Sequence, residues 1–164
     1  PLAKQAQHFA ENPQLARKRL APEFTVTTHD GQKFSTEQAI GRVVLIDFWA
    51  TWCGPCQEEL SYVKEMASDF DKKDVVILSV SWDKELDTWE QYIKGKRMTW
   101  PQYRDTDGML GQTFGVAAIP TYILIDRDGV VRRKATGGML DIRSDLKDLA
   151  AGKAIATDSK GKSE

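Results

Sequence analysis

Two cysteines stand three positions apart in the first half of the chain, and they are the only cysteines among its 164 residues. A disulfide between Cys53 and Cys56 would close a four-residue loop, which would stabilise the fold by only about 2 kcal/mol, against about 4.7 kcal/mol for a 100-residue loop. The pair is therefore poorly suited to a purely structural crosslink. Two neighbouring thiols that interconvert with a disulfide form a two-electron couple able to exchange with another protein's disulfide. The spacing predicts this chemistry.

Other uses of such a pair fit the rest of the sequence less well. A structural zinc site needs two further ligands, and the only histidines, His8 and His29, lie far upstream in separate segments. Covalent haem attachment requires a histidine directly after the second cysteine, where Gln57 stands. Two reduced structural cysteines without reactivity remain as an alternative. We expect neither a metal nor another cofactor.

The elements that flank the cysteines are predicted to give them different environments. Residues 43–48 form an apolar run broken only by Asp47, which is typical of a strand buried on both faces. After Cys56, apolar residues recur at intervals of three and four, which predicts an amphipathic helix whose inward face includes Cys56. Its stripe comprises Leu60, Val63, Met66, Ala67 and Phe70.

Cys53 is predicted to lie where this helix begins, beside unpaired backbone N–H groups and the positive end of the helix dipole. A dipole contribution of up to about 2 kcal/mol would lower a thiol pKa by roughly 1.5 units, from about 8.5 to about 7. Cys53 is therefore the predicted nucleophile, and Cys56 the predicted resolving thiol. Asp47, inside an apolar strand, should have a raised pKa because burial disfavours its charged form.

The remaining pattern predicts an α/β fold in which helices flank a central mixed sheet. A buried strand at 75–80 is followed by a helix striped by Leu86, Trp89 and Ile93. Trp100-Pro101 is interpreted as a turn. We then expect a short helix near 109–114, a hairpin pairing 122–125 with 130–131, and a last helix striped by Ile142, Leu146 and Leu149.

The N-terminal part carries two further signals. Residues 2–20 are predicted to be helical, with Asn12 and Pro13 as the N-cap and first residue of a second short piece. Residues 24–27 and 32–34 flank Asp30-Gly31, which predicts an added hairpin. We therefore divide the chain into a helical extension (1–20), one domain (21–151) and a flexible polar tail (152–164).

Composition excludes several classes of function. The formal net charge of -1 gives no indication of nucleic-acid binding, and no apolar run approaches the roughly 20 residues that span a bilayer. The chain begins at Pro1, without an initiator methionine, and is expected to be a processed product or a fragment of a longer protein.

Three motifs together resemble the active-site motifs of the thioredoxin superfamily. They are Asp47-Phe48-Trp49-Ala50, Trp52-Cys53-Gly54-Pro55-Cys56 and Ile119-Pro120-Thr121. Ala21-Pro22-Glu23-Phe24, with the Asp30-Gly31 hairpin, resembles more narrowly the TlpA-like branch, which includes ResA-type extracytoplasmic or membrane-tethered thiol-disulfide oxidoreductases. The resemblance covers residues 21 to about 150 and implies a thioredoxin-like fold.

The resemblance also implies roles for individual residues. Asp47 corresponds to a proton shuttle for the resolving cysteine; the alternative is an aspartate at the strand end that reaches water. Glu59 corresponds to the ResA-type glutamate near the second cysteine; the alternative is an ordinary acid in the first turn of a helix. A cis Ile119-Pro120 bond is implied opposite Cys53, with the Ile119 backbone available to an extended substrate. Trp52 would supply an apolar rim for substrates, and Gly54-Pro55 a tight helix start, whereas Trp49 is assigned to the core.

These residues predict a thiol-disulfide oxidoreductase that acts as a reductant. Two alternatives are a thiol peroxidase of the peroxiredoxin kind and a redox-switched binding module without turnover. The peroxiredoxin motif places a threonine three residues before the reactive cysteine, but Ala50 stands there and Thr51 is one residue late. By resemblance, the expected partners are disulfide-containing proteins, including apocytochromes c, and a membrane thiol transporter as electron donor. A monomer in the periplasm or another extracytoplasmic compartment is expected, membrane-anchored at full length, the alternative being a cytoplasmic protein.

Overall fold

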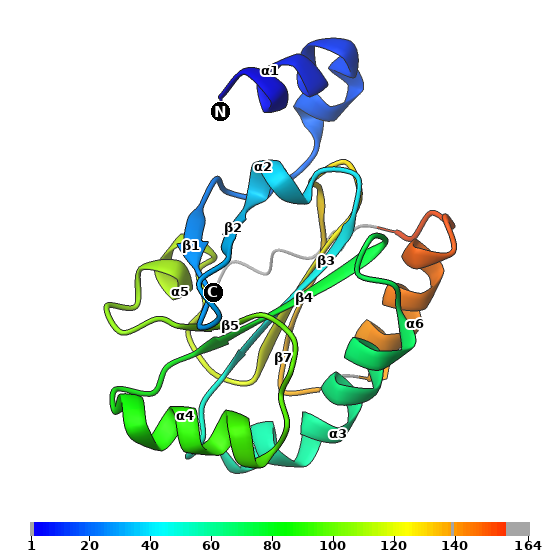
Figure 1. Ribbon diagram of the computed structural model, residues 1–164. Helices are drawn as coiled ribbons and strands as arrows, with labels where there is room; N and C mark the ends of the chain where they lie inside the picture. Colours follow the sequence, from blue (N-terminus) through cyan, green and yellow to red (C-terminus); the bar gives the residue numbers. More distant parts are fainter. Residues whose placement is uncertain (1, 139, 157–164) are drawn as a thin grey trace.

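A five-stranded mixed sheet lies at the centre of the protein in the computed structural model, which describes residues 2–138 and 140–156 (Figure 1). The strand order is β5-β4-β3-β6-β7, with β3, β4 and β5 parallel and β6 and β7 antiparallel to their neighbours. This confirms the predicted mixed α/β architecture. The strands are β3 (Val43–Trp49), β4 (Val75–Ser81), β5 (Gln102–Arg104), β6 (Thr121–Ile125) and β7 (Val131–Thr136).

Strand β3 is central, and all seven of its residues are buried. Alternate side chains of a strand point to opposite faces, so each face of β3 contributes to a separate apolar core. Val43, Leu45 and Trp49 belong to the core of the first face, and Val44, Ile46 and Phe48 to that of the second. Asp47 shares its alternation with Leu45 and Trp49 and therefore lies on the first face.

Helices cover the first face of the sheet, and a mixed layer covers the second. The first layer holds α3 (Gly54–Asp69), α4 (Leu86–Gly95) and α6 (Leu140–Ala150) (Figure 1). Buried residues of all three helices join the core of the first face, which also contains both cysteines. The predicted stripe of α4 is wrong at Leu86, which is 44% exposed, whereas Trp89 and Ile93 are buried.

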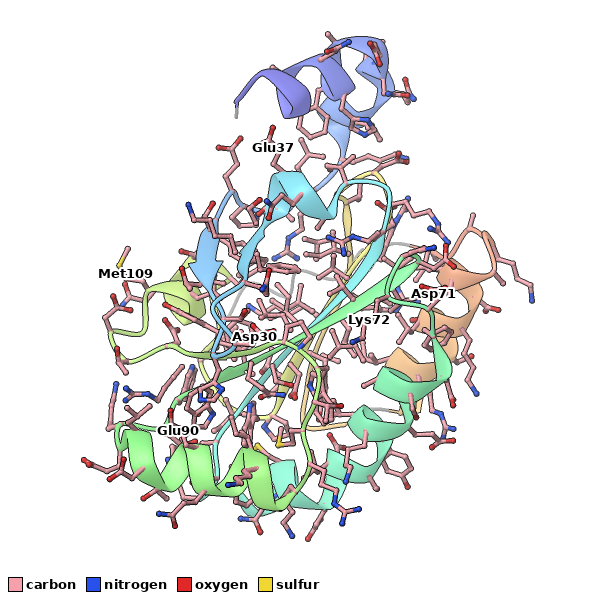
Figure 2. All side chains as sticks on the ribbon, viewed as in Figure 1. Asp30, Glu37, Asp71, Lys72, Glu90 and Met109 are labelled. Carbon is pink, nitrogen blue, oxygen red and sulfur yellow. A yellow bond between two sulfur atoms is a disulfide. The ribbon has the colours of Figure 1, made fainter. Side chains whose placement is uncertain are left out.

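The second layer comprises a separate hairpin, α2 (Thr36–Ala39) and α5 (Met109–Thr113). The hairpin pairs β1 (Thr25–Thr27) with β2 (Lys33–Ser35) and turns at Asp30-Gly31, as predicted. Helix α2 was not predicted; the Ser35 hydroxyl accepts a hydrogen bond from the Gln38 N–H at 3.2 Å and caps it. Figure 2 shows Met109 at the start of α5 and projecting from the surface, consistent with its 65% exposure.

The hairpin turn also contacts the first layer across the edge of the sheet. The His29 N–H donates to the Gln102 carbonyl at 2.8 Å, and the His29 ring pairs with Glu90 of α4 at 2.9 Å. Figure 2 shows Asp30 of this turn close to β5 and Glu90 on α4 below it. The hairpin is thereby fixed to the short edge strand.

The N-terminal extension is helical over part of its length only. Helix α1 (Leu2–Glu11) is followed by a 3-10 helix at Pro13–Arg17, so the second short piece exists but is not α-helical. Asn12 precedes it without capping it through its side chain, which instead donates to the His8 carbonyl at 2.8 Å. Residues 18–20 leave the helix, and Leu20 forms a β-bridge with Val130. Backbone pairing therefore joins the end of the extension to the sheet.

Two other expectations need correction. Strand β5 was missed. Strand β7 is longer than the two residues predicted, because three consecutive basic residues, Arg132, Arg133 and Lys134, hide the alternation of apolar and polar residues typical of a strand. At the C-terminus, Ile155 packs against the core of the first face, and Arg133 Nη1 donates to the Ala156 carbonyl at 2.6 Å. The predicted tail is thus anchored up to 156, and the prediction for 157–164 lies outside the described residues.

Candidate active site

The two cysteines form a disulfide where the chain passes from β3 into α3. Helix α3 begins at Gly54, with Pro55 in its first turn, and Cys53 is its N-cap. The Cys53 sulfur accepts a hydrogen bond from the Cys56 N–H at 3.3 Å. This confirms the predicted helix start, and the same N–H would stabilise negative charge on the Cys53 sulfur after reduction.

The two sulfurs are largely shielded by the protein. Cys53 and Cys56 are each 6% exposed and belong to the core of the first face. Trp52, by contrast, is 65% exposed directly beside them, and Gly54 and Pro55 are also exposed. Trp52 therefore presents an apolar surface beside Cys53, and its role as a rim for substrates stays a prediction. Trp49 is buried, as expected of a core residue.

Asp47 is a buried acid on the same face of the sheet as the disulfide. It is 3% exposed, and the Ser79 hydroxyl donates to its Oδ2 at 2.9 Å. The pKa of Asp47 is raised to about 7, mainly by burial and to a smaller extent by the negative charge of Glu59, whereas the bond from Ser79 opposes the shift. The predicted rise in pKa is confirmed. An acid with this pKa can both give and accept a proton near neutral pH.

Trp100 continues this hydrogen-bond chain, which corrects its interpretation as part of a simple turn. Its side chain is buried at 6% exposure, and its indole Nε1 donates to the Ser79 hydroxyl at 2.8 Å. The indole therefore occupies one acceptor site of the hydroxyl, whose proton points to Asp47. The sequence could have indicated a polar partner for Asp47 here, because Ser79 interrupts an apolar strand and pairs with Asp47 in the β3–β4 register.

Glu59 lies on the other side of Asp47 and has a specific partner. The Tyr122 hydroxyl donates to Glu59 Oε2 at 2.6 Å, and Tyr122 is 1% exposed. Tyr122 pairs directly with Asp47 in the β3–β6 register, so both side chains lie on one face. Burial and the two carboxylates raise the pKa of Tyr122, which keeps its hydroxyl protonated as a donor. Glu59 is half-buried and the adjacent Glu58 is exposed.

The third predicted motif has the expected backbone geometry. The Ile119-Pro120 peptide bond is cis. Pro120 is buried, whereas Ile119 is half-buried and packs against the core that contains both cysteines. The Thr121 hydroxyl donates to the Ala118 carbonyl at 2.7 Å, which ties the segment before the proline to the start of β6.

Sequence reasoning missed one further acid near the disulfide. Asp83 follows β4, is 3% exposed, and accepts hydrogen bonds from the N–H and the hydroxyl of Thr51. Its signal was its position, because an acid directly after a buried parallel strand lies at the edge of the sheet where β3 also ends. Among residues 2–138 and 140–156, no group of three or more His, Cys, Asp or Glu side chains could hold a metal ion.

Comparison with known proteins identifies the family. The model of the AhpC/TSA family matches residues 18–134, which is most of the chain. The chain belongs to the AhpC/TSA family. One relative is the thiol-disulfide oxidoreductase ResA of Bacillus cereus. It is 31% identical to this chain over 130 residues, which cover 79% of this chain and 75% of the relative.

Solved structures agree with this assignment. A thiol-disulfide oxidoreductase from Bacteroides fragilis superposes with a TM-score of 0.70 at 27% identity, covering 80% of this chain and 99% of the other. The exposed lipoprotein thioredoxin Etrx1 of Streptococcus pneumoniae gives a TM-score of 0.68 at 28% identity, covering 78% and 100%. The fold of this AhpC/TSA chain is thus thioredoxin-like, and the resemblance to ResA-type proteins is confirmed.

Proposed function

We propose that this chain is a thiol-disulfide oxidoreductase that reduces disulfides in protein substrates outside the cytoplasm. The observation that carries the proposal is the Cys53–Cys56 disulfide at the start of α3, with the Cys53 sulfur accepting the Cys56 N–H at 3.3 Å. Relatives named thiol-disulfide oxidoreductases support the same activity. Residues 21–151 would form the unit that carries it, with 1–20 as an appended extension and residues 152–156 packed back against the unit.

The reaction begins with the reduced pair. The Cys53 thiolate attacks one sulfur of the substrate disulfide, forms a mixed disulfide and expels the other substrate sulfur as a thiolate, which takes up a proton. Cys56 then loses its proton and attacks the Cys53 sulfur. This restores the Cys53–Cys56 disulfide and releases the second substrate thiol, so two electrons pass to the substrate.

Asp47 is proposed to accept the proton that Cys56 loses when it attacks the mixed disulfide. Its buried carboxylate has a pKa of about 7, so it is partly ionised near neutral pH and can accept this proton during resolution. Glu59, whose charge acts on Asp47 and whose carboxylate is fixed by Tyr122, assists as a second proton-handling group. In the next cycle, reduction of the disulfide returns a proton to Cys56.

Substrate docking is assigned to the surface around Cys53. The exposed Trp52 and half-buried Ile119 offer apolar contact, and the backbone of Ile119 before cis Pro120 can pair with an extended peptide. Gly54 and Pro55, exposed in the first turn of α3, leave room for a protein chain to approach the sulfur. The substrate would therefore be a segment of protein rather than a small molecule.

Partners and location follow from the relatives and the earlier resemblance. We propose disulfide-containing proteins, with apocytochromes c among them, as substrates and a membrane thiol transporter as electron donor. We propose a monomer that is membrane-anchored at full length and lies in the periplasm or another extracytoplasmic compartment. The similarity to an exposed lipoprotein thioredoxin supports this location over the cytoplasm. In the part of the chain that the structure describes, no helix is long and apolar enough to cross a membrane. The cysteine pair requires no cofactor.

Turnover of a model substrate tests the activity. The reduced protein with dithiothreitol should accelerate the reduction of insulin disulfides, and Cys53→Ser should abolish the acceleration while the fold is retained. Rapid consumption of hydrogen peroxide without disulfide reduction would instead favour a thiol peroxidase. Binding of oxidised substrate without any catalysed reduction would favour a redox-switched binding module.

A further inference from the structure

The residue two positions before the nucleophile has all its polar groups bonded. The Thr51 N–H donates to Asp83 Oδ2 at 2.9 Å, and its hydroxyl donates to Asp83 Oδ1 at 2.6 Å. Its carbonyl accepts a hydrogen bond from the side chain of Gln57, in the first turn of α3. Thr51 is thus tied at once to the segment after β4 and to the helix that Cys53 caps.

Asp83 is itself held in a fixed orientation. The Ser81 hydroxyl donates to Asp83 Oδ2 at 2.5 Å, and the Asp83 N–H donates back to the same hydroxyl at 2.9 Å. The Trp82 N–H donates to the Trp49 carbonyl at 2.9 Å, which joins the ends of β3 and β4 next to this acid. With 3% exposure, Asp83 is a buried carboxylate with three donors, and this number of bonds is what a buried charge requires.

We propose that Asp83 is a positioning residue for Cys53, acting through Thr51 and resting on the proposed thiol-disulfide function. The turn from Ala50 to Cys53 is short, with the Cys53 N–H donating to the Ala50 carbonyl at 3.2 Å. Fixing Thr51 therefore fixes the position of the Cys53 sulfur relative to the Cys56 N–H. That contact determines how strongly the helix start favours the Cys53 thiolate.

This arrangement also explains the role of Thr51, which lies one residue from the position of the peroxiredoxin threonine. The Thr51 hydroxyl is bonded to a buried carboxylate rather than free for a reacting oxygen. Its function is to orient the turn before the nucleophile, and Trp52, which follows it, is oriented by the same bonds. The site thus uses an acid at the end of one strand to shape the turn that follows the neighbouring strand.

The test compares two substitutions that differ in one hydroxyl. Thr51→Val keeps the size and branching of the side chain but removes the donor to Asp83, whereas Thr51→Ser keeps the donor. The pH dependence of Cys53 alkylation by iodoacetamide is measured on the reduced proteins. Both variants leave the nearby titratable groups in place: Asp47 on β3, Glu59 on α3, Asp83 after β4, Tyr92 on α4 and Tyr122 on β6.

We expect Thr51→Val to lower the Cys53 thiolate-to-thiol ratio at pH 7 by roughly 3- to 10-fold, which is a rise of about half a unit to one unit in the alkylation midpoint. Thr51→Ser should stay within about twofold of the parent. Asp105→Asn is the matched control, because Asp105 is 1% exposed and accepts the N–H groups of Leu110 and Gly111 at the start of α5. It should lower the melting temperature without moving the midpoint.

Two results would overturn the positioning role. One is an unchanged midpoint in Thr51→Val, and the other is an equal shift in Thr51→Val and Thr51→Ser, since the hydroxyl would then not be the cause. Alkylation requires no substrate disulfide. A chain that failed to reduce insulin would therefore contradict the proposed function while leaving this measurement decisive for Asp83.

Discussion

The Tyr122 hydroxyl donates to Glu59 at 2.6 Å and thereby connects the sheet to the first turns of the helix that carries the disulfide. Tyr122 pairs in register with Asp47, which in turn pairs with Ser79 on its other side. Three neighbouring strands therefore present a tyrosine, an acid and a serine in one row on the face that packs against the cysteines. Within this row, the pKa of Asp47 is set by its burial, by the bond from Ser79 and by the charge of Glu59.

Removing the Tyr122 hydroxyl should cost stability because a half-buried carboxylate loses its donor. Tyr122→Phe is expected to lower the free energy of unfolding by about 1 to 3 kcal/mol, measured by urea denaturation of the oxidised protein. Tyr62→Phe is the control: Tyr62 is on the exposed side of α3 at 39% exposure, and its change should stay within about 0.5 kcal/mol. Equal changes in the free energy of unfolding for the two variants would show that the hydrogen bond from Tyr122 to Glu59 does not stabilise the fold.

The pH dependence of stability should report Asp47. Its pKa is about 7 in the fold, against about 3.9 in an unfolded chain, so its contribution to stability is complete below pH 4 and is lost as pH rises through 7. Asp47→Asn removes this loss and should stabilise the oxidised protein by about 2 to 4 kcal/mol at pH 8 relative to its effect at pH 4. Asp69→Asn, at the exposed end of α3, serves as control. Parallel pH profiles for parent and Asp47→Asn would contradict the raised pKa.

Ser79 should hold the pKa of Asp47 down, since its hydroxyl stabilises the ionised form. Ser79→Ala is expected to raise this pKa above its parent value and to cost about 1 to 3 kcal/mol, because the buried Trp100 N–H also loses its acceptor. Carbon-13 NMR of the Asp47 carboxyl measures the titration directly. The exposed Ser68→Ala should change neither quantity, and a lowered Asp47 pKa in Ser79→Ala would refute the assignment.

Much of the fold could be predicted because local pattern and long-range packing agree in it. The run at 43–48 has the composition of a strand buried on both faces, and the stripe after Cys56 has helical spacing, so the position of the cysteines between them followed directly. The buried environment of Asp47 followed from the same run. The cis bond before Pro120 came from the resemblance, since few X-Pro bonds are cis and nothing local to the sequence indicates one.

The missed features depend on contacts between segments distant in sequence. Tyr122 and Glu59 are 63 residues apart, and Thr51 and Asp83 are 32 apart, so neither bond leaves a local pattern. Strand β5 has only three residues and begins after Pro101, which made Trp100 appear to belong to a turn. Register explains the rest: once β3, β4 and β6 are aligned, Ser79 and Tyr122 necessarily flank Asp47.

Trapping of the substrate complex tests the central claim most directly. Reduced Cys56→Ser protein is mixed with an oxidised protein substrate, quenched with acid and analysed by mass spectrometry, with Cys53→Ser treated in the same way. We predict that Cys56→Ser accumulates a mixed disulfide through Cys53, because nothing remains to resolve it, and that Cys53→Ser forms none. Equal trapping by the two variants, or trapping through Cys56 alone, would contradict the assignment of Cys53 as the nucleophile.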